Sequence, residues 1–392
     1  MHPTSSIAMR VFTSLSLFAL AAASAVKGRP KQREVAPVFN IDGKNQYFAG
    51  TNTWWMSHLT SDDDVEQAMS QIADSGLKVT RVWAFGNTNT GADQPVYFQF
   101  LDTTKKTITI NNGTNGIARL DAAVAAAEKH GIQLVLPMLN NWDDLGGINT
   151  YCAYFGCTHE NFWTHAEAQK AYRDYVTFIV NRYKDSPAIF SWQLCNEPRC
   201  QNCDTSVITS WATELSSFIK SLDPKHRVSL GDEGWLCSDD TSLGYAYSCS
   251  EGIDFEANLK ISTLDYGTVH MYPIGWGYTY PWGNQWIRDH AALALKYGKP
   301  IVLEEYGVES TTSNRTAVLQ QWQQTIIDSD IAYDSFWQFG TNLPSGANPY
   351  DDYALFYGTQ EYQDVVIDHA QDISKKAVST AARRRASSRR SN

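Results

Sequence analysis

Short apolar segments alternate with amphipathic helical patterns along most of the chain, and this alternation constrains the fold more than any other feature. Eight segments have the length and composition of buried strands, and helical patterns that end at glycine or proline lie between most of them. The alternation predicts an α/β protein in which eight parallel strands close into a single (β/α)8 TIM barrel. The predicted strands cover residues 47–55, 79–85, 132–139, 190–194, 227–230, 266–272, 299–305 and 332–339.

Other patterns predict the elements around these strands. A turn signal at Asp42-Gly43 between two apolar runs predicts a short N-terminal hairpin over residues 38–48. Residues 86–116 are expected to form a long loop with strands of its own at 97–101 and 107–110, and residues 146–160 an irregular loop. The predicted helices cover residues 62–75, 117–130, 166–184, 206–222, 286–297, 316–328 and 361–377.

Both ends of the chain differ in composition from the rest. Arg10 precedes a mostly apolar stretch and then a run of small residues, which is typical of a secretory signal peptide and too short to span a bilayer. We therefore expect a secreted, extracellular protein. The expected divisions are a signal peptide at 1–25, a pro-segment or spacer at 26–36, one folded domain at 37–377 and a disordered, arginine-rich tail at 378–392.

The charge of the predicted domain limits its partners. Residues 37–374 contain 20 basic and 41 acidic side chains, so their net charge is about −21. Such a negatively charged surface does not attract nucleic acid or anionic polymers, whereas it does not repel a neutral polysaccharide. An aromatic content of 12% also favours a carbohydrate ligand. We expect a monomer that binds neither nucleic acid nor a membrane.

Seven cysteines in a secreted chain indicate three disulfides and one free thiol. Cys195, in a predicted buried strand, is the expected free residue. The CxxC motif at Cys200–Cys203 is of a kind that also occurs in redox and zinc sites, but the sequence has neither a second CxxC nor a metal-spaced histidine pair. A disulfide that closes a loop is therefore the preferred interpretation. Asn112 and Asn314 lie in glycosylation sequons. The preferred pairs are Cys200/Cys203, Cys237/Cys249 and Cys152/Cys157.

A carboxylate and an amide directly follow the strand predicted at 190–194. Pro198 must end this strand because proline cannot donate to a sheet ladder. Asn196 and Glu197 are therefore left at the carboxyl tip of the strand, which is where α/β barrels place ligand-binding and catalytic groups.

A second carboxylate, that of Glu305, follows the apolar run that begins at Lys299 and also lies at the tip of a predicted strand. Two acids on two strand tips of one barrel suggest glycoside hydrolysis, in which one carboxylic acid protonates the leaving oxygen and the other carboxylate attacks the sugar or activates water. Glu304 competes with Glu305 for this role, but a strand alternates its faces, so only one of them should point inward. The alternative of solvated loop acids is disfavoured, because Glu197 and Glu305 directly follow buried runs.

Several motifs at the strand tips carry a family resemblance. They are FAGTNTWW, RVWAF, NNWDD, LCNEPRCxxC, VHMYP, LEEYG and SFWQFG. Together they resemble glycoside hydrolase family 5, a retaining family of (β/α)8 enzymes, and more closely its fungal secreted endo-β-1,4-mannanases. The resemblance covers about residues 38–375, and it is less specific for mannan than for the family.

The resemblance implies that Glu197 is the general acid/base and Glu305 the nucleophile, since the family's nucleophile directly precedes an aromatic-Gly pair. It also implies a set of substrate-binding side chains around them. A hydrogen-bonded core histidine is the alternative for His270, and barrel packing is the alternative for Trp337. The implied set is Arg81, Trp83, Asn196, Arg199, His270, Tyr272 and Trp337, with Trp55, Trp142 and Trp276 as further sugar platforms.

The resemblance implies a retaining endo-β-1,4-mannanase that cleaves internal β-1,4-mannosidic bonds of mannan, galactomannan and glucomannan by double displacement. No cofactor or metal is expected, since the sequence contains no HExxH, GxGxxG or P-loop motif. An endo-β-1,4-glucanase on the same barrel is the nearest alternative, because specificity resides in loops. A non-catalytic glycan-binding wall protein is the alternative of a different class, and the presence of both acids argues against it.

Overall fold

The computed structural model describes residues 36–91 and 94–378. The predicted signal peptide, the spacer up to residue 35 and the tail from residue 379 onwards lie outside the described residues. Ala36 is buried in the core, so the folded part of the chain includes the last residue of the predicted spacer.

Eight parallel strands form the central sheet, in the order β10-β9-β8-β4-β3-β13-β12-β11. Two backbone hydrogen bonds bring the ends of the sheet together, from Asp265 N to Val228 O (2.8 Å) and from His270 N to Glu233 O (3.1 Å). The predicted (β/α)8 barrel is confirmed. The strands are β3 (Phe48–Asn52), β4 (Val79–Arg81), β8 (Gln133–Pro137), β9 (Ile189–Gln193), β10 (Arg227–Ser229), β11 (Gly267–Met271), β12 (Ile301–Tyr306) and β13 (Tyr333–Phe336).

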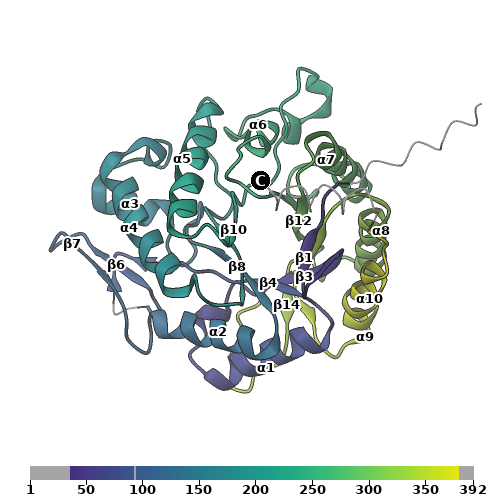
Figure 1. The fold of residues 1–392 in the computed structure, drawn as a ribbon, viewed down its shortest axis with the longest axis horizontal. Helices are drawn as coiled ribbons and strands as arrows, with labels where there is room; N and C mark the ends of the chain where they lie inside the picture. Colours follow the sequence, from purple (N-terminus) through teal and green to yellow (C-terminus); the bar gives the residue numbers. More distant parts are fainter. Residues whose placement is uncertain (1–35, 92–93, 379–392) are drawn as a thin grey trace, which may run out of the picture. The chain divides into compact units, whose positions relative to one another are not determined.

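Helices surround these strands (Figure 1). Residues at their ends explain their limits: Ser61 accepts a hydrogen bond from Asp64 N at the start of α1, and Gly131 and Gly298 adopt positive φ after α2 and α7. The bounds predicted for α2 and α5 are confirmed. The long helices are α1 (Asp62–Asp74), α2 (Ile117–His130), α4 (Ala166–Tyr183), α5 (Ser206–Leu222), α7 (Gly283–Tyr297) and α8 (Arg315–Asp328).

The predicted N-terminal hairpin is present and closes the amino end of the barrel. Its strands β1 (Phe39–Ile41) and β2 (Lys44–Gln46) pair antiparallel around Asp42 and Gly43, both at positive φ. The ring of Phe39 packs against four aromatic rings near the starts of barrel strands and in the loop before β11, namely Phe48, Phe190, Tyr266 and Tyr333. Because this apolar cluster fills the amino end, the carboxyl end is left for a binding cleft.

Two predicted segments differ in the structure. Residues 146–160, expected as an irregular loop, contain the helix α3 (Ile148–Phe155), because Ile148, Tyr151 and Cys152 present a buried face at helical spacing. The closing helix predicted at 361–377 is divided by a π-helical turn. Its parts are α9 (Gln360–Tyr362), the turn (Gln363–Ile367) and α10 (Asp368–Ser374).

Shorter elements belong to the loops. The long loop after β4 contains both predicted strands, β6 (Gln99–Asp102) and β7 (Thr107–Ile110), and a further strand, β5 (Asn87–Thr88), that pairs with β6. The other short elements are α6 (Phe255–Leu259), β14 (Phe339–Gly340), β15 (Leu355–Phe356) and the 3-10 helices Met56–His58, Phe162–Thr164, Thr241–Leu243, Tyr245–Tyr247 and Tyr280–Trp282.

The three predicted disulfides are present, and Cys195 is a buried free thiol. Asn112 and Asn314 of the two sequons are exposed. Among the described residues, no helix has the length and apolar character needed to cross a membrane.

Candidate active site

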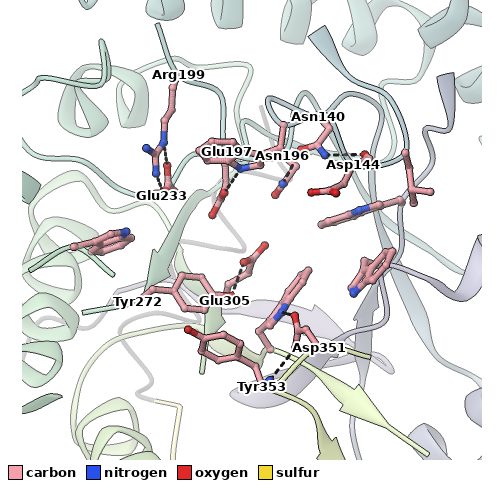
Figure 2. A pocket seen from close by; sticks show the side chains of 16 residues that line it. Asn140, Asp144, Asn196, Glu197, Arg199, Glu233, Tyr272, Glu305, Asp351 and Tyr353 are labelled. Atoms are coloured by element: carbon pink, nitrogen blue, oxygen red, sulfur yellow. Dashed lines mark hydrogen bonds and ion pairs between the residues drawn. The ribbon is translucent and has the colours of Figure 1, made fainter. Parts of the chain in front are cut away.

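A cleft of about 540 Å³ lies at the carboxyl end of the barrel strands. Glu197 and Glu305 both line it, and Figure 2 shows their side chains extending towards one another from opposite walls. Indole rings and polar side chains share the lining, which suits the apolar faces and hydroxyl edges of a sugar. The predicted site residues that line the cleft are Trp83, Trp142, Asn196, Glu197, Arg199, Tyr272, Trp276, Glu305 and Trp337.

Neighbouring strands hold the backbone of Glu197 in an uncommon conformation. Glu197 has a φ of 50°, a left-handed value that costs a non-glycine residue about 1–3 kcal/mol. Its N–H donates to Gly231 O (2.8 Å), beyond β10, and the N–H of Asn196 donates to Leu139 O (2.8 Å), beyond β8. These bonds maintain the strained backbone and set the direction in which the Glu197 side chain enters the cleft.

Two donors orient the Glu197 carboxylate. His270 Nδ1 lies 2.7 Å from Oε1, and Trp142 Nε1 donates to Oε2 at 2.6 Å. His270 belongs to β11 and is fully buried, whereas Trp142 follows β8 and is 41% exposed. Both oxygens of the candidate acid are therefore oriented by groups from two different strand ends.

Arg81, on β4, holds the Glu305 carboxylate. Its Nη1 forms an ion pair with Oε1, and Tyr272 donates to Oε2 at 2.9 Å. The other guanidinium nitrogens donate to Gln193 (Nε, 2.8 Å) and to Asn196 (Nη2, 2.6 Å), which fixes the group in place. A fixed and permanently charged partner favours the ionised form of Glu305.

Glu304 also points into the barrel, so the expectation that only one of the two glutamates does so is wrong. The register of β11 against β12 shifts between Val269 and His270, and Glu304 is the extra residue of a β-bulge. The bulge interrupts the alternation of faces. Glu304 nevertheless remains outside the cleft and fully buried, hydrogen-bonded to Gln193, while Glu305 lines the cleft.

Opposite charges bind one proton tightly between Glu197 and His270. Burial alone would lower the pKa of His270. The charge of Glu305 and hydrogen bonds to Glu197 and to Glu304 raise it to about 10. Burial alone would raise the pKa of Glu197, but His270 and Arg199 lower it to about 2. Burial and the charge of Glu197 raise the pKa of Glu305, against the attraction of His270 and Arg81. Glu197 and His270 titrate as a pair and together carry one proton between these two values.

Arg199 extends the site beyond Glu197. It forms a bidentate ion pair with Glu233, in which Nε–Oε2 and Nη2–Oε1 are both 2.7 Å, and its Nη1 lies 3.3 Å from Glu251 Oε2. Glu233 lines the cleft but was not among the predicted site residues. Its position at the carboxyl tip of the strand predicted at 227–230, after Gly231 and Asp232, is the signal that could have identified it.

Other indoles form the walls of the cleft. Trp337 and Trp83 lie with ring centres 6.0 Å apart, and Trp337 Nε1 donates to Asp351 Oδ2 at 2.7 Å. Trp54 also lines the cleft, and its buried Nε1 has no hydrogen-bond partner within the described part of the chain. A sugar hydroxyl is a natural acceptor for such a group.

Trp55 is not a sugar platform, which corrects the prediction. It is 1% exposed, its N–H donates to Gln338, and its ring packs against Phe339 and Tyr350. Because neighbouring residues leave the strand end in different directions, Trp54 faces the cleft and Trp55 the core.

One group of potential metal ligands lies in the cleft. Among the described residues, ligand atoms of Glu197, His270 and Glu305 all lie within 4.8 Å of one another. The pKa of about 10 leaves His270 protonated at neutral pH, and a protonated imidazole offers no lone pair to a metal. The arrangement suits proton transfer better than metal binding.

Comparisons of sequence identify one family. A family model described as GH family 5 beta-mannosidase-like matches residues 155–338. Mannan endo-1,4-beta-mannosidase A of Aspergillus aculeatus is 44% identical over 374 residues, which cover 93% of this chain and 98% of that protein. Probable mannan endo-1,4-beta-mannosidase F of Aspergillus flavus is 45% identical over 340 residues, which cover 86% of this chain and 73% of that protein.

Solved structures with a similar fold include endo-1,4-beta-mannanases as well. The endo-1,4-beta-mannanase from Rhizomucor miehei has a TM-score of 0.81 and 35% identity, covering 87% of this chain and 98% of its own. The endo-beta-1,4-mannanase from Thermotoga petrophila has a TM-score of 0.77 and 32% identity, covering 85% of this chain and 78% of its own. A barrel with paired carboxylates at its carboxyl end, together with these similarities, defines a glycoside hydrolase. The chain belongs to glycoside hydrolase family 5, and within that family it is similar to mannan endo-1,4-β-mannosidases.

Proposed function

We propose that the chain is a retaining endo-β-1,4-mannanase in which Glu305 is the nucleophile and Glu197 the general acid/base. The spacing of the two carboxylates carries this proposal, because an oxygen of each lies within 4.8 Å of the other. Retaining glycosidases place these groups about 5–5.5 Å apart, whereas inverting enzymes need about 6.5–9.5 Å to admit a water. The relatives named mannan endo-1,4-beta-mannosidase support mannan as the substrate.

In the first step, Glu305 attacks the anomeric carbon of the mannosyl unit that lies between the carboxylates. The bond to the leaving oxygen breaks, and a bond from the same carbon to Glu305 forms. The proton shared by Glu197 and His270 passes through Glu197 to the leaving oxygen. Arg81 and Tyr272 keep the attacking carboxylate in line.

In the second step, Glu197 acts as a base. It accepts a proton from a water molecule, and the water oxygen attacks the anomeric carbon and displaces Glu305. Each step inverts the configuration at this carbon, so the product retains the β-configuration. The pair of Glu197 and His270 is returned to its state with one proton.

Side chains near the carboxylates support recognition of a sugar chain. Asn196 is fixed by Arg81 and by a hydrogen bond to Asn140 Oδ1 (3.0 Å), beside Glu197, where it can contact the sugar 2-hydroxyl. Trp337 supplies an aromatic floor, and Trp54 supplies a free indole N–H. These groups favour binding of the mannosyl unit whose bond is cleaved.

Groups beyond Glu197 support binding of the leaving part of the chain. Arg199, Trp142 and Trp276 line the cleft, and Glu233 fixes the Arg199 guanidinium. Binding groups on both sides of the carboxylates are what an enzyme that cleaves inside a polysaccharide requires. Three disulfides are in keeping with an extracellular site of action, and we propose that the protein acts there as a monomer.

The proposal is tested by reducing-sugar release from galactomannan and from carboxymethyl cellulose, with wild type and Glu305→Ala side by side. Release from galactomannan that is lost in the variant is the expected result. Proton NMR of fresh digests of mannohexaose should show the β-anomer first. Release mainly from cellulose would instead indicate an endoglucanase, and an α-anomer formed first would exclude double displacement.

A further inference from the structure

Glu304 is a buried carboxylate to which the two steps of the reaction give no role. It is fully buried, it does not line the cleft, and it occupies the bulge of β12. The bulge interrupts the ladder between β11 and β12 and turns a charged side chain into the barrel interior. An anion is stable there only when cations and donors surround it.

Three side chains surround the Glu304 carboxylate. Its two oxygens accept hydrogen bonds from Gln193 Nε2 at 2.9 and 2.8 Å. Its Oε2 also lies 3.4 Å from Arg81 Nε and 3.4 Å from His270 Nε2. Arg81 and His270 therefore each have Glu304 on one side and a carboxylate of the cleft on the other.

We propose that Glu304 is a positioning residue for the hydrolytic reaction, which holds His270 with one N–H directed to Glu304 and the other to Glu197. In this arrangement the pair of Glu197 and His270 keeps the proton that the leaving oxygen requires. Glu304 does not reach the cleft, so it acts through the side chains that it contacts, and His270 is the one that shares a proton with Glu197. This proposal rests on the proposed function, since it takes Glu197 as the acid.

The contacts of the imidazole distinguish Glu304 from the carboxylates of the cleft: Glu304 lies at Nε2, whereas Glu197 and Glu305 (3.5 Å) both lie at Nδ1. The two carboxylates hydrogen-bonded to the ring are Glu197 at Nδ1 (2.7 Å) and Glu304 at Nε2 (3.4 Å). An imidazolium with an acceptor at each nitrogen is stabilised against loss of either proton. The carboxylates whose charges act on His270 are Glu197, Glu304, Glu305, Asp232 and Glu233, and Arg81 contacts two of these, Glu304 and Glu305.

Removing the charge of Glu304 should weaken proton binding by the pair. The pair then loses its proton at a lower pH, and Glu197 can no longer protonate the leaving oxygen. For a hydrogen bond to a charged group, the expected shift is about one to two pH units. The alkaline limb of kcat/KM should therefore move to lower pH by this amount, while KM at the optimum changes little.

Glu304→Gln is the test variant, because it removes the charge and keeps the shape. Asp334→Asn is the matched control: Asp334 is also a buried carboxylate on a barrel strand, but it bonds to Tyr306 and His369. Glu304→Asp, which keeps the charge, should restore much of the wild-type pH profile. The control should leave the alkaline limb of kcat/KM unshifted.

The ring-nitrogen NMR shifts of His270, assigned with a His270→Gln variant, give a second readout that needs no substrate. The wild type should show an imidazolium well above pH 7, and Glu304→Gln should lower the midpoint by the same one to two units. A folded Glu304→Gln variant with an unchanged limb and midpoint would overturn the proposal, as would an equal shift in Asp334→Asn.

The wild-type titration keeps the proposal testable if Glu304→Gln does not fold. A neutral His270 at pH 7 would then overturn it. Failure of the wild type to hydrolyse mannan would refute the proposed function but would leave the His270 titration to judge Glu304 separately.

Discussion

The indole of Trp142 donates a hydrogen bond from Nε1 to Oε2 of Glu197 at 2.6 Å, although 41% of the Trp142 side chain is exposed. The guanidinium of Arg199 lies 5.0 Å from the centre of the same ring. Trp142 thus connects the candidate acid with the groups that are expected to bind the leaving part of the substrate.

Trp142→Phe should separate the contribution of the indole N–H, which bonds to Glu197, from that of the aromatic ring, which contacts Arg199. Phenylalanine keeps an aromatic face but has no N–H, so Glu197 loses a donor that favours its carboxylate form. A hydrogen bond to a charged group contributes about 1.5–3 kcal/mol, so we expect kcat to fall roughly tenfold or more, with a smaller change in KM. Steady-state kinetics on galactomannan measure both. A Trp142→Phe variant with kcat close to the wild type, and a loss only in Trp142→Ala, would place the effect in the ring and not in the hydrogen bond.

Alanine variants of the two carboxylates should differ in their chemical rescue. Glu305→Ala removes the nucleophile and should lower kcat by roughly 10⁴-fold or more, and Glu197→Ala should cost about 10²–10⁴-fold with a natural leaving group. Added azide should attack directly in Glu305→Ala and give an α-mannosyl azide. In Glu197→Ala it should intercept the covalent intermediate and give the β-product. NMR of the azide products decides between these assignments.

Trp54→Ala and Trp55→Ala should affect different properties, although the residues are adjacent. Trp55 is packed in the core, so its truncation should cost about 3–5 kcal/mol of unfolding free energy and leave KM of the folded enzyme nearly unchanged. Trp54 lines the cleft, so its truncation should raise KM and lower stability less. Thermal melts and kinetics on the same preparations test the pair. A large KM effect for Trp55→Ala would contradict the assignment.

Stability should fall as the pH rises from about 4 to about 10. Burial raises the pKa of Asp232 from 3.8 to about 7, so the folded state holds a proton that the unfolded state has lost, which costs about 4 kcal/mol by pH 7. His270, whose folded pKa is raised from 6.5 to about 10, contributes stability below pH 6.5 that is lost towards pH 10. Glu197 acts in the opposite direction below pH 4.5, since its pKa is lowered to about 2.

Melting temperatures measured from pH 3 to pH 10 test this prediction and should be highest near pH 4–5. Burial and the charge of Glu197 also raise the pKa of Glu233 from 4.5 to about 7. Asp232→Asn therefore removes part of the loss between pH 4 and pH 7, and its stability should vary less than that of the wild type over this range. A wild-type maximum above pH 7 would show that these buried groups do not control the pH dependence.

Much of the fold could be predicted because its signals are local. Hydrophobic periodicity and glycine stops locate the barrel strands and give the limits of α2 and α5. The short helix α3 was missed because glycines and an asparagine surround its three buried residues. The split of the closing helix by a π-helical turn leaves no signal in periodicity, since the apolar face continues through it.

The candidate site was predictable where it follows from strand ends. Asn196, Glu197 and Glu305 come directly after buried runs, and the structure brings them to one cleft. Glu233 lies at a strand tip as well, two residues further along, but nothing local marks its ion pair with Arg199, because the two residues are 34 positions apart. Which of Trp54 and Trp55 faces the cleft likewise depends on the packing of distant residues.

The sequence by itself determined the barrel, the three disulfides and the presence of acids at two strand tips, since each depends on patterns within a few residues or on short spacings. Only the tertiary structure decided how the glutamates of β12 are used. A β-bulge is a property of the register between two strands, so alternation within one strand cannot reveal it. The bulge turns both Glu304 and Glu305 inward, and their different depths in the barrel separate the candidate nucleophile from the buried partner of His270.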